Sequence, residues 1–500
     1  MADPNTQSLE SPAGATGVAE ASDFSRLLEK EFKPKTDHAK VAISSAVDTL
    51  AKIALENTPL ISQDAIKTIE SLIATLDQRI SQQLNHVLHH PDFQKLEGTW
   101  RGLSYLVNNT ETDEKLKIKV MNVTKKELGK TLQKYEGTAW DQSPLFKKIY
   151  ENEYGMPGGQ PFGCLMGDYE FDHSPPDVQI LNGMMQISAS AHCPFITAPS
   201  PKLLNMDSWQ ELSNPRDLTK IFETADYAPW RSLRKSDDSR YLGLAMPRFL
   251  ARLPYGAKTN PVSEFAFEED VEGAHHGKYT WSNAAYAMAR NINRSFKLYG
   301  WCACIRGAES GGMVESLKCH TFPTDDGGVD MKCPTEISIT DRRESELAKN
   351  GMMPLLHYRN TDYAVFMGAQ SLQKPDTYDD PDATANANLS ARLPYLFATC
   401  RFAHYLKCIV RDKIGSFAER SDMEKFLNRW IMQYVTGDPE NASQEEKAKR
   451  PLAAAEIKVE SVEGNPGYYT SKFYLRPHYQ LEGLQVSLRL VSKLPSEKGA

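Results

Sequence analysis

The chain has 500 residues, enough for roughly two to four domains, and its net charge is −7. This acidic balance argues against a protein built around a phosphate-binding surface, such as a nucleic-acid-binding protein. No run of about 18 apolar residues occurs, so no transmembrane helix is predicted. The N-terminus lacks the features of a secretory signal, and the eight scattered cysteines are typical of reduced thiols in a cytoplasmic protein.

The N-terminal part of the chain is predicted to contain a disordered segment, 1–36, followed by two helices within 37–90. The segment 1–36 has too few apolar side chains to fold. The second helix, from Ser62, carries an apolar seam at heptad spacing, formed by Ile66, Ile69, Ile73, Leu76, Ile80 and Val87. So narrow a seam on a polar helix should pack against one or two partner helices. Both the preceding helix, 36–57, and another subunit remain open as the partner.

The long central region, 91–372, alternates helical patterns with short apolar runs. The predicted helices are Leu96–Leu106, Thr124–Tyr135 and Trp281–Tyr299, and the predicted strands are Lys117–Val120, Phe162–Met166 and Ala364–Met367. This alternation indicates a mixed α/β (α+β) fold.

The C-terminal region contains two polar, Pro- and Asp-rich stretches, 373–388 and 437–456, which are predicted to be linkers or surface loops. The helical region between them, 389–436, contains a long helix from Ser390 to Phe417. Its polar positions are rich in basic residues, among them Arg401, Lys407, Arg411 and Lys413.

The last segment, 457–494, has the period-two alternation of β-strands. Glu456–Val462 is predicted to be an edge strand. Two further strands carry apolar residues on alternate positions, at Tyr469, Phe473 and Leu475 and at Leu484, Val486, Leu488 and Leu490. An isolated hairpin is marginal in water, and an unpaired edge is a template for another chain. These two strands, which have no evident partner of their own, therefore suggest exchange with a neighbour; completion of this chain's own sheet is the alternative.

Two residue clusters could hold a metal ion, but neither has the expected spacing. Cys302, Cys304, Cys319, His320 and Cys333 lack the C-x2-C pairs of a zinc ribbon, which favours buried thiols. Asp168, Glu170, Asp172 and His173 follow a predicted strand, where α/β enzymes hold magnesium, with Asp177 close behind. A row of acids on an extended segment is more often a solvated edge. No P-loop motif occurs, and no cofactor, metal or catalytic residue is predicted.

Particular strings along the chain carry a resemblance to a known family. They include Leu96–Leu103, Gly167–Phe171, Ala191–Phe195, Gly243–Arg248, Ser295–Trp301, Leu389–Tyr395, Arg401–Lys407, Arg411–Phe417, Pro477–Glu482 and Ser487–Val491. In order and without large gaps, from residue 37 to 494, the chain resembles the large sheath subunit of the type VI secretion system (the TssC/VipB, or EvpB, family).

The resemblance implies a structural protein with a fold similar to contractile phage tail sheaths, and no enzyme. Members pair with the small subunit TssB (VipA) and polymerise with themselves around a tube of Hcp. Contraction then propels the tube and its spike for effector delivery. The polymer lies in the bacterial cytoplasm, docked on a membrane-anchored baseplate, and the ATPase ClpV disassembles it mainly through TssB. No nucleic acid and no membrane insertion are implied.

The resemblance also implies roles for the segments described above. The C-terminal strands would join strands of neighbouring protomers by β-augmentation, and the seam of Ile66–Val87 would contact the small subunit. The basic helix is a candidate for the wall that faces the tube, on its charge pattern alone. A sheath of another contractile injection system, and a metal-dependent enzyme using Asp168, Glu170 and Asp172, are the alternatives.

Overall fold

The computed structural model describes residues 65–214, 217–263, 265–271, 273, 275–324, 326–413, 420–461 and 469–480, with Val41 and Ser45. The chain forms two compact units, one of Met1–Leu88 with Tyr255–Asp270 and one of His89–Pro254 with Val271–Ala500. The segment 1–36, the start of the second helix at Ser62 and the strand from Leu484 to Leu490 lie outside the described residues, as does the helix 36–57 apart from Val41 and Ser45. No helix in the described ranges is long and apolar enough to cross a membrane.

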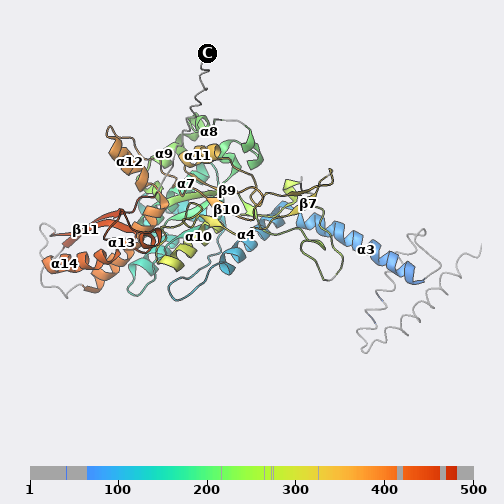
Figure 1. The fold of residues 1–500 in the computed structure, drawn as a ribbon, viewed down its shortest axis with the longest axis horizontal. Coiled ribbons are helices and arrows are strands. Elements are labelled where there is room, and N and C mark those ends of the chain that lie inside the picture. Colours follow the sequence, from blue (N-terminus) through green and yellow to red (C-terminus); the bar gives the residue numbers. More distant parts are fainter. Residues whose placement is uncertain are drawn as a thin grey trace, which may run out of the picture. The chain divides into compact units, whose positions relative to one another are not determined.

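The first unit contains the helix α3, Ala65–Leu88, and the loop 255–270 (Figure 1). Within this unit, the side-chain oxygen of Asn85 accepts a hydrogen bond from the backbone N–H of Asp270 (3.0 Å). The carboxylate of Glu269 accepts one from the N–H of Tyr255 (2.8 Å), which closes the loop at its base. The seam predicted from heptad spacing therefore lies on a regular helix.

The second unit is built on a six-stranded sheet of order β1-β2-β3-β9-β10-β6. Its strands are β1 Leu165–Phe171, β2 Phe195–Pro199, β3 Leu242–Met246, β9 Met352–His357, β10 Ala364–Phe366 and β6 Met313–Val314. The first four are parallel, while β10 is antiparallel to both β9 and β6. All residues of β2 and β3 are buried, as expected for parallel strands covered on both faces.

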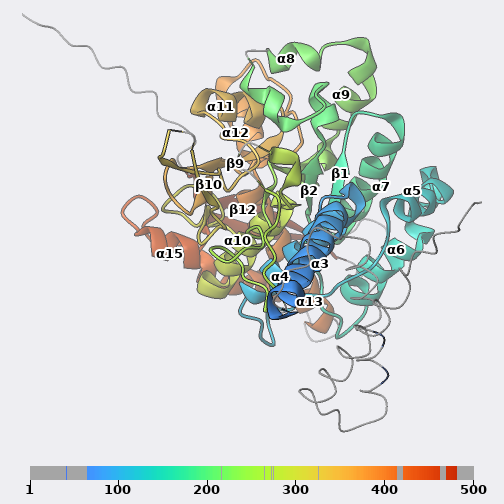
Figure 2. The same ribbon diagram turned by 90° about the vertical axis from the view of Figure 1, so that its right-hand side faces the viewer.

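Helices cover both faces of this sheet, and the strand residues alternate between two cores. Leu244 and Met352 pack in a core with α7, Pro175–Ala191, whereas Ala245 and Met353 pack in another core with α10, Ala284–Tyr299. Figure 2 shows α7 and α10 on the two sides of β1 and β2. The period-two pattern of buried strands thus places neighbouring residues on opposite faces.

The helix α4, Pro91–Asn108, lies against α10 and against the neighbouring stretch Trp281–Ser282 because its glycines permit a close approach. A Cβ at Gly98 would collide with the carbonyl oxygen of Trp281, and one at Gly102 with the ring of Tyr286. The hydroxyl of Ser282 donates a hydrogen bond to the carbonyl of Gly98 (2.8 Å) at the same contact.

The remaining elements surround this centre. They are α5 Lys125–Lys134, α6 Pro144–Phe146, a π-helix Lys147–Gly155, α8 Leu218–Ile221, α9 Ala228–Lys235, α11 Asp341–Lys349, α12 Pro381–Ser390, α13 Leu393–Lys413, α14 Arg420–Ile431 and α15 Gln444–Lys449. Two short ladders pair β4 Phe249–Leu250 with β5 Trp281–Ser282 and β7 Thr321–Pro323 with β8 Val329–Met331. The C-terminal strands are β11 Leu452–Ser461 and β12 Tyr469–Pro477.

The mixed helix-and-strand class is confirmed, and several element predictions are corrected. The predicted strand Lys117–Val120 is wrong, since this stretch has no regular secondary structure and pairs with no described strand. The predicted strand Phe162–Met166 begins only at Leu165 and runs to Phe171, so Asp168 and Glu170 lie within β1, whereas Asp172 follows its end. The predicted helix from Trp281 begins at Ala284, because Asn283 caps it.

Neither polar stretch of the C-terminal region is an irregular linker throughout. The first, 373–388, contains most of α12, whose N-cap is Asp380. The second, 437–456, contains α15 and the first residues of β11, and Ser443 caps α15 by accepting a hydrogen bond from the N–H of Glu446. Short polar helices of this kind have no apolar periodicity, which is why composition alone indicated loops.

Candidate functional site

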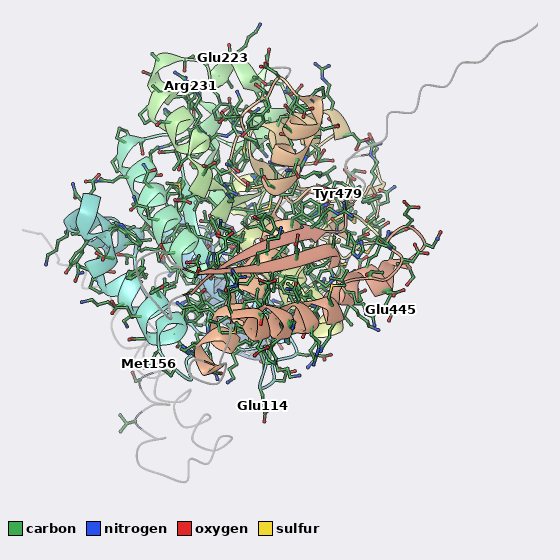
Figure 3. The ribbon with its side chains drawn as sticks, turned by 90° about the vertical axis from the view of Figure 1, so that its left-hand side faces the viewer. Glu114, Met156, Glu223, Arg231, Glu445 and Tyr479 are labelled. Atoms are coloured by element: carbon green, nitrogen blue, oxygen red, sulfur yellow. The ribbon has the colours of Figure 1, made fainter. Side chains whose placement is uncertain are left out.

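The C-terminal strands β11 and β12 form an antiparallel pair, with Lys458 opposite Lys472 and Ile457 opposite Phe473. Figure 3 shows the two strands lying side by side above α14. The prediction that the strand from Tyr469 has no partner of its own is wrong, because β11 pairs along its full length. The edge strand expected at Glu456–Val462 corresponds to the C-terminal half of that partner, which begins earlier, at Leu452, and ends at Ser461.

On the side of β11 that faces away from β12, side chains of α14 form hydrogen bonds with the backbone of the strand. The amide nitrogen of Asn428 donates to the carbonyl of Ile457 (2.7 Å), and its oxygen accepts from the N–H of the same residue (3.0 Å). The carboxylate of Glu424 accepts from the N–H of Val459 (2.9 Å). These three bonds occupy the backbone groups that another strand would need, so this edge cannot be extended.

The bonds to α14 also determine which backbone groups of β12 point outward. In an antiparallel pair, opposed residues either exchange hydrogen bonds or both direct their N–H and C=O away from each other. Ile457 and Val459 direct theirs to α14, so their partners Phe473 and Ser471 direct theirs to the outer edge of β12. Within the described part of the chain, no strand pairs with this edge.

An aromatic core holds the strand pair on the rest of the unit. The rings of Trp301 and Phe402 stack at 4.3 Å between centroids, and Tyr434 packs edge-on against Phe402 at 5.6 Å. Ile457 and Val459 are buried in the same core. Phe473, in contrast, is 39% exposed on the outer strand. The pair is thus a fixed platform with an exposed aromatic ring beside its open edge.

The chain leaves this platform at an anchored residue, Gln480. Its backbone N–H donates to the hydroxyl of Tyr395 (2.9 Å), and its side-chain nitrogen donates to the carbonyl of Ala303 (3.0 Å). Its side-chain oxygen accepts from Nε of Arg306 (2.7 Å), a residue that is itself buried. The point from which the predicted strand Leu484–Leu490 departs is therefore fixed to the body of the unit.

The seam of α3 presents apolar side chains to solvent. Ile73, Ile80 and Val87 are 48%, 47% and 44% exposed. Leu76 is half-buried, and the side chains of Ile66 and Ile69 lie outside the described residues. A row of half-exposed branched side chains at heptad spacing is typical of a helix surface that packs against a partner.

The basic residues of α13 are largely engaged by aromatic rings of this chain. The ammonium of Lys407 lies 3.7 Å from the ring centroid of Tyr154 and donates to the hydroxyl of Tyr150 (3.1 Å). The guanidinium of Arg401 lies 4.8 Å from the ring of Tyr405. Arg401, Lys407 and Arg411 are all half-buried, and the side chain of Lys413 lies outside the described residues. Their assignment as tube-facing candidates stays a prediction.

The acidic residues in β1 and just after it have mainly separate partners, although the N–H of Asp172 donates to the carboxylate of Asp177 (2.8 Å). Asp168 accepts from the hydroxyl of Tyr286 (3.2 Å), Glu170 lies 3.7 Å from Arg248, and Asp172 accepts from the N–H of Ser174. His173 stacks on Tyr227, and Asp177 pairs with Lys125 at 2.7 Å. No group of three or more possible ligands that could hold a metal occurs within the described ranges, the cysteines included. The separate partners make this row structural.

Comparisons with known proteins cover almost the whole chain. Residues 70–373 match the model of the EvpB tail sheath N-terminal domain, and residues 382–494 match that of the EvpB tail sheath gpW/gp25-like domain. The type VI secretion system sheath protein TssC1 of Pseudomonas aeruginosa is 69% identical over 500 residues, which is 100% of both chains.

Two solved structures are more distant. One is the helical sheath of the anti-feeding prophage in its contracted state, with a TM-score of 0.30 and 11% identity over 64% of this chain and 68% of that chain. The other is the baseplate of the same particle, with a TM-score of 0.32 and 10% identity over 63% and 67%.

Proposed function

The chain belongs to the EvpB family of tail sheath proteins, and we propose that it is the large subunit of a type VI secretion sheath. The observation that carries this proposal is the identity of 69% to TssC1 over the full length of both chains. Its role is then mechanical: the subunit polymerises around the Hcp tube, and contraction propels tube and spike for effector delivery. No catalytic residue is assigned, because tail sheath proteins are structural.

The outer edge of β12 is the proposed site at which neighbouring protomers are joined. A strand added there would bond to the outward N–H and C=O groups of Ser471 and Phe473, whereas α14 excludes addition at β11. The donor is the segment carrying Leu484, Val486, Leu488 and Leu490, whose alternation fits strand addition. Each such hydrogen bond contributes about 1 kcal/mol net, so several contribute a few kcal/mol. Because every protomer of the polymer repeats this contact, a few kcal/mol per protomer are enough to keep neighbouring protomers joined.

The seam of α3 is the proposed contact with the small subunit TssB. Its exposed Ile73, Ile80 and Val87 would be buried by one or two partner helices, and Ile66, Ile69 and Leu76 continue the same row. Burial of apolar surface contributes roughly 25 cal/mol per Å², so a seam of this length supports a stable heterodimer. ClpV would then act on the assembled sheath mainly through TssB.

The end of α13, with Arg411 and Lys413, is the proposed region that faces the Hcp tube. Exposed charge pairs are weak and are screened by salt, which suits a contact that must hold the tube and then release it. The free energy for contraction would be stored at assembly, in keeping with the absence of a P-loop from the sequence. The sheath would stand in the cytoplasm on a membrane-anchored baseplate.

Co-expression with the small-subunit candidate, followed by negative-stain electron microscopy of the lysate, tests this proposal. Hollow tubules with a cogwheel cross-section, formed only when both chains are present, are the expected result. Tubules formed by this chain alone would instead favour the sheath of another contractile injection system. A discrete particle with stoichiometric metal would contradict the sheath function and favour an enzyme.

A further inference from the structure

Two half-buried cysteines, Cys319 and Cys333, stand opposite each other just beyond the β7–β8 ladder. The ladder pairs Thr321 with Met331, and the N–H of Lys332 donates to the carbonyl of His320 (2.8 Å), which continues the same register by one residue. The next opposed pair is Cys319 and Cys333, at a position that exchanges no backbone hydrogen bonds. Opposed residues of this type have Cα atoms about 4.5 Å apart, within the range of about 4.4–6.8 Å that a disulfide spans.

His357, the last residue of β9, lies beside the thiol of Cys333. Its Nε2 lies 2.8 Å from the carbonyl of Thr361, which can only accept, so Nε2 carries a proton and Nδ1 is left for Cys333. The sulfur of Cys319 also points to the carbonyl of Thr361, at 3.8 Å. The carbonyl of Leu317 lies slightly nearer to the Cys319 sulfur, at 3.6 Å. The carbonyl of Thr361 thus orients the imidazole that bonds to Cys333 and also lies close to the sulfur of Cys319.

The surroundings of the two thiols shift their pKa values in opposite directions. Burial raises the pKa of Cys333, but hydrogen bonds from His357 and Thr335 outweigh it, so the net pKa is below the usual value. Burial raises the pKa of Cys319, which therefore remains protonated. Burial likewise raises the pKa of Cys302 and Cys304. A thiolate stabilised by a histidine is the nucleophilic form of cysteine.

We propose that Cys319 and Cys333 form a dithiol site that hydroperoxides oxidise to a disulfide. The Cys333 thiolate attacks one oxygen of hydrogen peroxide, the O–O bond breaks, and the released hydroxide takes the proton of the His357 imidazolium to become water. Cys333 is then a sulfenic acid. The sulfur of Cys319 attacks it, the S–S bond forms as the S–O bond breaks, and the Cys319 proton leaves with the hydroxide as a second water.

The disulfide would join the two strands at the base of the β7–β8 hairpin. Both thiols are half-buried rather than enclosed, so a molecule as small as hydrogen peroxide can reach them. Cys319 is close enough to resolve the sulfenic acid before a second oxidant arrives, which protects Cys333 from irreversible oxidation.

Peptide mapping of the full-length chain tests the site directly. The reduced protein is treated with stoichiometric hydrogen peroxide, blocked with iodoacetamide and digested with trypsin. Cleavage after Lys318, Lys332 and Arg342 places the two cysteines in separate peptides, 319–332 and 333–342. The expected product is a disulfide-linked pair of these peptides, formed before any other cysteine is oxidised. If Cys333 is oxidised no faster than Cys304, or links to another cysteine, the proposal is overturned.

Variants separate the roles of the three residues. Cys319→Ser should accumulate a sulfenic acid on Cys333 that dimedone traps, and His357→Gln should slow oxidation of Cys333 by roughly tenfold at neutral pH. Cys304→Ser is the matched control and should form the linked peptides at the wild-type rate. An unchanged rate in His357→Gln would contradict the role of the imidazole. The peptide map of the oxidised wild-type chain tests the proposal even where a variant fails to fold.

Discussion

Asn428 of α14 satisfies both backbone groups of Ile457 in β11, through its amide nitrogen at 2.7 Å and its amide oxygen at 3.0 Å. Together with Glu424, which accepts from the N–H of Val459, this side chain takes the place of a neighbouring strand on this edge. The open edge of the pair is consequently the one on β12, and the direction in which a sheet could grow is determined by a helix residue.

Replacing Asn428 with leucine should destabilise the C-terminal region. Two backbone groups of Ile457 would lose their partners, at a cost of about 1–3 kcal/mol for each group that remains buried. The free energy of unfolding, measured by urea denaturation, should fall accordingly. Asn441→Leu is the control, because Asn441 is exposed and bonds to the nearby Asp438. Equal stability of the two variants would show that the cap on β11 is dispensable.

Proline at Ser471 should block assembly without unfolding the strand pair. The N–H of Ser471 points away from β11, so its loss leaves the β11–β12 ladder intact, as for proline on other edge strands. The variant should bind the small subunit but form no tubules in electron micrographs. Ser471→Ala should form tubules as the wild type does. Normal tubules from Ser471→Pro would contradict strand addition at β12.

Charging the seam of α3 should abolish pairing with the small subunit. Aspartate at Ile73 or Ile80 would place a carboxylate in the buried contact and lose about 1 kcal/mol or more of apolar burial for each side chain. Co-purification with the small subunit measures the effect. Gln82→Asp, an exposed change on the same helix outside the seam, should still co-purify. Retained pairing by Ile73→Asp and Ile80→Asp together would rule the seam out as the contact.

Glu336 should make the second unit sensitive to acid. Burial raises its pKa, but hydrogen bonds from Arg248 (2.6 Å) and His276 outweigh this and lower the pKa to about 2 from 4.5. Because the folded-state pKa is below the unfolded one, the ionised carboxylate stabilises the fold above about pH 4.5, by on the order of 3 kcal/mol. This contribution is lost as the pH falls from 4.5 toward 2.

Urea unfolding at several pH values between 2 and 6 measures this dependence. Glu336→Gln should be less stable than the wild type at pH 6 and should lose the fall in stability within that window. Glu456→Gln, an exposed change on β11, should keep the wild-type profile. A wild-type profile in Glu336→Gln would mean that other carboxylates govern the acid response.

Patterns that repeat along one element could be predicted from the sequence. The heptad spacing of Ile73, Ile80 and Val87 and the alternation around Phe473 each depend on the period of a single helix or strand. The beginning of β11 could not be predicted, because Ala453 and Ala454 have no alternation and follow a charged helix. The cap by Asn428 and Glu424 was also missed, since polar residues four apart on a helix are typical of a solvated face.

Contacts between distant segments were the main source of error. Lys407 was predicted at a polar position of its helix, but Tyr150, 257 residues earlier, brings an aromatic hydroxyl to it. The opposition of Cys319 and Cys333 depends on the register of a hairpin, which no spacing of cysteines reveals. Side-chain surroundings of this kind follow from tertiary packing rather than from local pattern.

The anchoring of Gln480 has a mechanical consequence. A pull on the chain beyond this residue would be borne first by Arg306, Ala303 and Tyr395, which bond to it from the body of the second unit. Tension would therefore pass into the buried core before it could peel β12 from β11. The hydrogen bonds between the two strands would therefore carry little of the load.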